Sequence, residues 1–204
     1  MSFFEIKNIS CIRGNKLLFK NLNFKLKNQE LLVIKGANGS GKTTLLKILS
    51  GLLKPLSGSI IFDKKNINTS KDEYLKLFEY IGHENAIKNA LTVRENLNFY
   101  LKIKKNLKKE NFKNAIKIFN LKHLLDIKIE NLSSGEKRRV SLSRLILSNS
   151  KIWFLDEPTN SLDKKNTLIF FKILNQHLKS NGIAVIASHD EINIKNKNID
   201  LTIN

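Results

Sequence analysis

Residues 31–44 read Leu-Leu-Val-Ile-Lys-Gly-Ala-Asn-Gly-Ser-Gly-Lys-Thr-Thr. The run Leu31–Ile34 is continuously apolar, which is typical of a strand buried on both faces of a parallel sheet. The segment Gly36–Thr43 fits the pattern G-x-x-x-x-G-K-[ST], and a helix is expected to follow over residues 42–50. Because the pattern lies between a buried strand and a helix, it predicts a loop that binds phosphate groups.

Each part of this loop has a separate chemical task. The glycines let backbone N–H groups wrap the phosphates, and the helix N-terminus adds a favourable dipole. Lys42 is expected to reach the β- and γ-phosphate oxygens, and the Thr43 hydroxyl is expected to bind Mg²⁺. The expected nucleotide-binding residues are Gly36, Asn38, Gly39, Ser40, Gly41, Lys42, Thr43 and Thr44.

A second apolar strand, Ile152–Leu155, ends in two carboxylates, Asp156 and Glu157. Ligands of open α/β sheets bind at the carboxyl ends of the strands. Asp156 is therefore expected to hold Mg²⁺, usually through water. Glu157 is then placed to orient or deprotonate the water that attacks a phosphate.

The rest of the chain predicts an α/β fold with a helical insertion. Residues 21–27 alternate apolar and polar side chains like a half-exposed strand, and residues 183–187 form another buried strand. Three segments match a capping box at a helix start: Ser70-x-x-Glu73, Thr92-x-x-Glu95 and Ser133-x-x-Glu136. Residues from about 85 to 150 are therefore expected to be mostly helical, inserted in a parallel α/β core.

The charge of the chain has two competing explanations. The 204 residues include 36 basic and 18 acidic ones, a formal net charge of +18. This excess suggests a nucleic-acid partner, but all except five of the basic residues are lysines, and they are scattered along the chain. We therefore favour a compositional bias toward A- and T-rich codons and expect no specific nucleic acid. Weak contact with anionic lipid follows from either explanation.

Other protein classes are disfavoured by the sequence. No apolar run approaches the roughly 20 residues that a membrane-spanning helix needs. The first residues lack a basic head and an apolar segment, so we expect no secretory signal. The single cysteine, Cys11, cannot form an internal disulfide, which fits a reducing cytosol.

The segment Leu132-Ser133-Ser134-Gly135-Glu136 alone indicates only the start of a helix. With the two nucleotide motifs present, it resembles the signature motif of ATP-binding cassette (ABC) ATPases. Ser161-Leu162-Asp163 is similar to the D-loop of that family, and His189 stands where its switch histidine lies. The resemblance covers essentially the whole chain.

This resemblance implies an ABC-type nucleotide-binding domain of the P-loop NTPase class. A helical subdomain with the signature motif, residues 85–150, would be inserted in a RecA-like core formed by 1–84 and 151–204, with an antiparallel β element at the N-terminus. It also implies nucleotide contacts by Ser133, Ser134, Gly135, Glu136 and Asp163, and a γ-phosphate contact by His189.

Within the family, the chain looks most like the ATP-binding subunits of bacterial haem exporters of cytochrome c maturation. The similar segments are 11–14, 80–83, 87–88, 91–92, 95–97, 138–144 and Trp153. By position, His83 replaces the Q-loop glutamine and Arg13 replaces the aromatic residue that stacks on adenine, which a guanidinium plane can also do. A solvated Arg13 and a His83 that only packs between lobes remain alternatives. Two features depart from the pattern of these subunits. One is Glu136 in the signature motif, and the other is the run Thr159–Ser161, which resembles ABC ATPases in general.

The resemblance implies a peripheral ATPase at the cytoplasmic face of the inner membrane. It would act as a homodimer, each ATP lying between the Lys42 loop of one chain and the Ser134 helix of the other. Separately encoded membrane permease subunits would transport haem or act with a haem-handling partner. The alternatives are the ATPase of another small ABC exporter and a soluble nucleic-acid-associated ABC ATPase, which would need a long coiled coil or two cassettes. A pure nucleotide-binding regulator is disfavoured because Glu157 is present.

Overall fold

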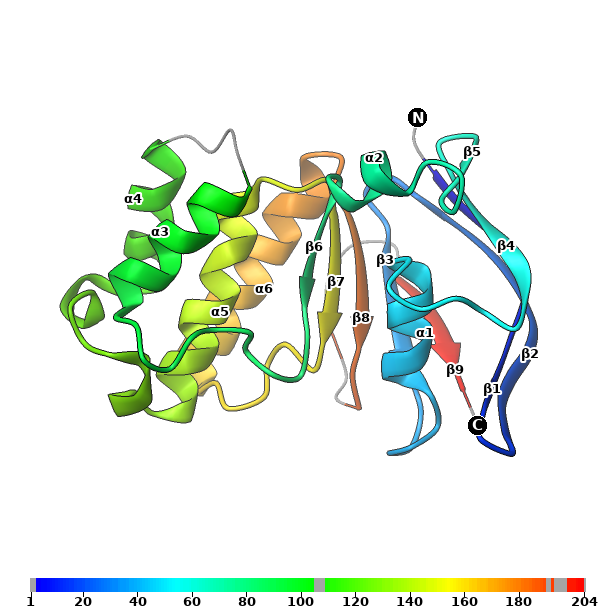
Figure 1. Cartoon of the computed structure of the whole chain (residues 1–204), viewed down its shortest axis with the longest axis horizontal. Coiled ribbons are helices and arrows are strands. Elements are labelled where there is room, and N and C mark those ends of the chain that lie inside the picture. The colour runs from blue at the N-terminus through cyan, green and yellow to red at the C-terminus, as the bar shows by residue number, and fades with distance from the viewer. Residues whose placement is uncertain (1–2, 105–108, 190–191, 193–197, 204) are drawn as a thin grey trace.

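A parallel sheet lies at the centre of the computed structural model, which describes residues 3–104, 109–189, 192 and 198–203 (Figure 1). Its strand order is β6-β7-β8-β3-β9, and every neighbouring pair is parallel. The strands are β3 (Leu31–Lys35), β6 (Phe78–Ile81), β7 (Ile152–Asp156), β8 (Ile183–Ala187) and β9 (Asn198–Thr202). The buried strands expected near residues 31, 152 and 183 are thus confirmed.

An antiparallel sheet of order β2-β1-β4-β5 covers one side of the molecule. Its strands are β1 (Phe3–Arg13), β2 (Lys16–Lys27), β4 (Ser57–Phe62) and β5 (Lys65–Asn66). The alternating segment 21–27 is the second half of β2, and its partner along the whole length is β1. The N-terminal antiparallel element is therefore confirmed.

The helices lie on both faces of the parallel sheet (Figure 1). They are α1 (Lys42–Leu49), α2 (Lys71–Leu75), α3 (Val93–Ile103), α4 (Lys109–Ile118), α5 (Ser134–Ser148) and α6 (Lys164–Lys179), with short 3₁₀ turns at Lys122–Leu124 and Ile129–Asn131. Helix α1 lies between the two sheets, and α3 to α6 lie on the other side. The expected helix over 42–50 is confirmed. Of residues 85–150, expected to be mostly helical, 85–92 form a loop and 93–148 are mostly helical; residues 105–108 lie outside the described residues.

Two of the three expected capping boxes are present. Thr92 with Glu95 begins α3, and Ser133 with Glu136 begins α5, each with both reciprocal hydrogen bonds. The box at Ser70 is wrong, although α2 does begin there. The Ser70 hydroxyl donates instead to the carbonyl of Asn66, and the expected partner carboxylate of Glu73 pairs with Lys65.

The central strands serve two separate cores. Along β3, Leu31 and Val33 pack with helices α3 to α6, whereas Leu32 and Ile34 pack with α1 and the antiparallel sheet. Strands β7 and β8 alternate in the same way. A strand with a core on each face has no polar side, which explains why these segments are continuously apolar in sequence. No helix within the described ranges is long and apolar enough to cross a membrane.

Candidate nucleotide site

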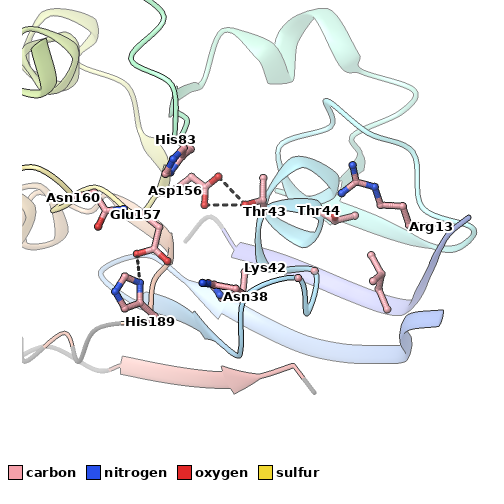
Figure 2. A pocket seen from close by; sticks show the side chains of 13 residues that line it. Arg13, Asn38, Lys42, Thr43, Thr44, His83, Asp156, Glu157, Asn160 and His189 are labelled. Carbon is pink, nitrogen blue, oxygen red and sulfur yellow. Dashed lines mark hydrogen bonds and ion pairs between the residues drawn. The ribbon is translucent and has the colours of Figure 1, made fainter. Parts of the chain in front are cut away.

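A cavity of about 530 Å³ opens at the carboxyl ends of β3, β7 and β8 (Figure 2). Its walls come from the β1–β2 hairpin, the loop before α1, the segment after β6 and the ends of β7 and β8. It is lined by Arg13, Leu18, Asn38, Gly39, Gly41, Lys42, Thr43, Thr44, His83, Asp156, Glu157, Asn160 and His189. The structure therefore brings together most of the residues that the sequence singles out.

The glycine-rich loop lies between β3 and α1 with its backbone in conformations that favour glycine. Gly39 has φ 81° and Gly41 has φ 110°, both in the left-handed region. The Lys42 ammonium group donates to the carbonyls of Gly36 at 2.8 Å and Ala37 at 3.1 Å. This folds the lysine against its own loop, beside the N-terminus of α1, where an anion is favoured.

Thr43 and Asp156 meet across the floor of the cavity (Figure 2). The Thr43 hydroxyl donates to both carboxylate oxygens of Asp156, at 2.8 Å to Oδ2 and 3.1 Å to Oδ1. Asp156 is 2 % exposed, and this burial is the main reason why the pKa of its carboxyl is raised. One hydroxyl and one carboxylate form an all-oxygen donor set, which fits Mg²⁺.

Glu157 follows Asp156 at the end of β7, in an unusual backbone conformation. Its φ is 46°, and its backbone N–H donates to the carbonyl of Ala187 on β8 at 2.8 Å. Its carboxylate is 3.0 Å from Nδ1 of His189, which follows β8. The two side chains expected to act on the terminal phosphate therefore contact each other at the cavity wall (Figure 2).

The remaining lining residues lie at the two sides of the cavity. Arg13, at the end of β1, lies on one side, and His83, after β6, lies on the other, beside Asp156 (Figure 2). Leu18 and Asn160 also line the cavity, although no sequence motif singles them out. Leu18 stands in the strand that pairs with the Arg13 strand, and Asn160 lies in the turn after Glu157, so both could have been inferred from neighbours in sequence.

The other expected residues lie elsewhere in the part of the chain that the structure describes. Gly36 and Ser40 belong to the loop but do not line the cavity. Ser133, Ser134, Gly135 and Glu136 also lie away from it, at the N-terminus of α5. Asp163 caps α6 by accepting a hydrogen bond from the backbone N–H of Asn166 at 2.7 Å.

The signature residues form a well-ordered helix start. The Glu136 carboxylate accepts hydrogen bonds from the Ser133 N–H at 2.9 Å and the Ser133 hydroxyl at 2.8 Å. The backbone hydrogen bond is the main cause that lowers the pKa of the Glu136 carboxyl. A Cβ placed on Gly135 would be only 2.8 Å from the carbonyl oxygen of Ser161, so glycine permits this close approach.

Comparisons with known proteins agree on one family. The sequence pattern of the ABC transporter family matches residues 19–160. The "Cytochrome c biogenesis ATP-binding export protein CcmA" of Wolbachia pipientis is 42% identical over 185 residues, covering 91% of this chain and 88% of that protein. The protein of the same name in Reclinomonas americana is 41% identical over 204 residues, covering 98% and 90%.

Solved structures show the same fold. A putative ABC transporter ATP-binding protein from Pyrococcus furiosus superposes with a TM-score of 0.83 at 26% identity, covering 98% of this chain and 97% of that one. A dimeric ATP-binding cassette in a post-hydrolysis state with ADP and Pi gives 0.79 at 27% identity, covering 92% and 88%. The chain therefore belongs to the ABC transporter family and has the fold of its ATP-binding cassettes.

Proposed function

We propose that this chain is the ATP-hydrolysing subunit of an export complex that acts in cytochrome c biogenesis. The function of the complex is suggested by relatives at 35–42% identity that carry that name. The proposed chemistry rests on one observation. The Thr43 hydroxyl donates a hydrogen bond to the Asp156 carboxylate, and Glu157, the next residue, lines the same cavity.

ATP would occupy the cavity with its triphosphate at the loop and its base toward Arg13. The phosphates would take hydrogen bonds from the backbone N–H groups of residues 38–44 and from Lys42. The Arg13 guanidinium would stack on adenine, with Leu18 contributing apolar surface beside it. Asn38 and Thr44 line the same wall and would contact the phosphates.

Thr43 and Asp156 would hold Mg²⁺ between them and the phosphates. Bound there, the ion would neutralise part of the charge on the phosphate oxygens. Asp156 is kept in place by its hydrogen bonds from Thr43. His83, on the Asp156 side of the cavity, would donate a hydrogen bond to water near the ion, since Mg²⁺ prefers oxygen ligands to imidazole.

Glu157 would accept the proton of the attacking water as general base. Its carboxylate lies at the wall of the cavity, 9 % exposed, within 3.0 Å of the His189 ring. That contact holds the carboxylate in one orientation, and His189 would contact the γ-phosphate when ATP is bound. The pair thus provides a base for the water and a donor for the phosphate that it attacks.

The signature residues would complete the site on a second copy of the chain. Ser133, Ser134, Gly135 and Glu136 lie at a helix N-terminus outside the cavity of their own chain, where a helix dipole favours an anion. A two-fold dimer would place this helix end against the ATP of the partner, with Asp163 near the interface. We propose residues 85–150 as the subdomain that carries it, and 1–84 with 151–204 as the core.

The partners of the dimer would be separately encoded membrane subunits, and the cargo haem or a haem-handling partner. The chain would then bind peripherally at the cytoplasmic face of the inner membrane. The excess of lysines would add a weak contact with anionic lipid.

The test is a deletion of the gene in the host, complemented with the wild-type chain or with Glu157→Gln. We expect the deletion strain to lose covalently bound haem from its c-type cytochromes. The wild-type chain should restore this haem and Glu157→Gln should not, although both chains should co-purify with membrane subunits. Normal cytochromes c in the deletion strain would contradict the proposed export role and point to another small exporter.

A further inference from the structure

Arg138 reaches from α5 to the turn that carries both carboxylates of the site. Its Nε donates to the carbonyl of Pro158 at 3.1 Å, and its Nη2 donates to the carbonyls of Asp156 at 2.9 Å and Glu157 at 2.7 Å. The side chain is 3 % exposed. One guanidinium therefore binds three consecutive carbonyls at the end of β7.

The same guanidinium also binds the segment that carries His83. Its Nη1 donates to the carbonyl of Gly82 at 2.8 Å and is 3.4 Å from Oδ1 of Asn85. Gly82 directly precedes His83, so Arg138 bridges the turn after β7 and the loop after β6. These two segments supply Asp156, Glu157 and His83 to the cavity.

The hydrogen bonds from Arg138 reach a residue, Glu157, whose backbone conformation is unfavourable for a side chain. Glu157 has φ 46°, a region in which a residue other than glycine is strained by about 1 kcal/mol or more. Three hydrogen bonds fix its backbone: the N–H donates to the carbonyl of Ala187, and the carbonyl accepts from Arg138 and from the N–H of Asn160 at 3.2 Å. A guanidinium is protonated at neutral pH and therefore keeps all its donors.

We propose that Arg138 is a positioning residue for hydrolysis: it fixes the backbone of Glu157 so that the carboxylate stays at the cavity wall. It acts through Glu157 and does not touch ATP, and this inference rests on the proposed role of Glu157 as the base. A planar guanidinium is suited to the task because its donors have a fixed geometry that an ammonium group lacks.

The test is Arg138→Met, which removes the donors and keeps most of the apolar volume. We expect kcat for ATP hydrolysis to fall by roughly 20-fold or more, because a base displaced by about 1 Å loses much of its effect. The dissociation constant of Mg-ATP should stay within about threefold, since the phosphate loop is untouched. Unchanged kcat, or a loss confined to KM, would overturn the proposal.

Arg94→Met is the control for the loss of an arginine. Arg94 lies on α3, and its guanidinium binds the carboxylate of Asp126 at 2.9 Å, outside the lining of the cavity. The control removes the same charge from the same subdomain, and we expect kcat within about twofold of wild type. An equal loss of kcat in both variants would assign the effect to the lost positive charge and overturn the role of Arg138.

A double-mutant cycle separates this inference from the role of Glu157. If Arg138 acts through Glu157, adding Arg138→Met to Glu157→Gln should lower the residual rate by less than about twofold. Rapid turnover in Glu157→Gln alone would refute the base itself. A slow Glu157→Gln beside a fast Arg138→Met would refute only the positioning role.

A folding defect is covered by a second substitution. If Arg138→Met fails to unfold cooperatively, Arg138→Lys decides the question, because it keeps the charge and a single donor group. We expect its kcat to be reduced several-fold, with normal Mg-ATP affinity. A wild-type kcat in Arg138→Lys would then overturn the proposal.

Discussion

The parallel sheet and helix α5 present their candidate site residues in different ways. On the sheet, the pairing of Asp156 with Ala187 continues the register of β7 and β8, so backbone hydrogen bonds place the carboxylates. Helix α5 packs apolar side chains into the core on one face of this sheet, and several of its polar side chains also bind the backbone around the site. Arg138, Ser141 and Arg144 donate to backbone carbonyls of the segments around β6 and β7, including Asn85 at 2.9 Å and Tyr80 at 2.7 Å.

This difference shows two degrees of constraint within one domain. A strand register cannot slip by one residue without moving every buried side chain to the other face. Side-chain hydrogen bonds can be removed one at a time by substitution, and each contributes about 1 kcal/mol to stability. The sheet therefore fixes where the carboxylates lie, whereas the polar contacts between α5 and the site can be loosened singly by substitution.

The largest effect is expected on the sheet, from Glu157→Gln. If Glu157 is the base, kcat should fall by at least about 100-fold while Mg-ATP still binds, because the amide keeps the shape of the side chain and loses its basicity. Steady-state hydrolysis and equilibrium nucleotide binding measure the two effects. A rate within a few-fold of wild type would remove Glu157 from the mechanism.

The contribution of α5 to a partner site is tested by mixing two inactive variants. Lys42→Ala should weaken ATP binding at least tenfold or so, and Ser134→Glu places a negative charge where a phosphate would lie. Each alone should hydrolyse little ATP, but a heterodimer would regain one intact site and roughly half the wild-type rate. Heterodimers without any gain in rate would exclude the arrangement across two chains.

His83 lies where the two regions meet, and its effect should be smaller. We expect His83→Ala to keep its ATP affinity and to reduce the stimulation of hydrolysis by the membrane subunits about 2- to 10-fold, the worth of one hydrogen bond. His83→Gln should recover part of this stimulation. The measurement compares the rate of ATP hydrolysis by the chain alone with the rate in the reconstituted complex. Equal stimulation of wild type and His83→Ala would mean that His83 only packs between the two regions.

The smallest effect, on the free energy of unfolding, is expected from substitutions at two helix N-termini, one with a capping box and one without. Thr92→Ala removes a reciprocal capping box and should lower the free energy of unfolding by about 1 kcal/mol. Ser70→Ala removes a hydroxyl that caps nothing and should cost less than about 0.5 kcal/mol. Urea unfolding of both variants checks this, and equal losses would contradict the difference that the structure shows.

The sequence predicts what depends on contiguous residues. The loop Gly36–Thr43 and the pair Asp156 and Glu157 are local patterns with one chemical meaning, and the three central strands are recognisable because they are buried on both faces. The contacts of Arg138 could not be predicted, because its partners are backbone carbonyls, which every residue has. The box at Ser70 failed because Asn66 and Lys65 compete for the same two side chains.

If Glu157 is the base, its left-handed backbone sets activity and stability against each other at one position. Glycine adopts this conformation without the strain that a Cβ brings, so Glu157→Gly should unfold at the same temperature as Glu157→Gln or a few degrees higher. Selection for stability alone would favour glycine here, whereas selection for turnover would require the carboxylate if Glu157 is the base. A glutamate retained at a position that suits glycine is what a trade-off between stability and function predicts.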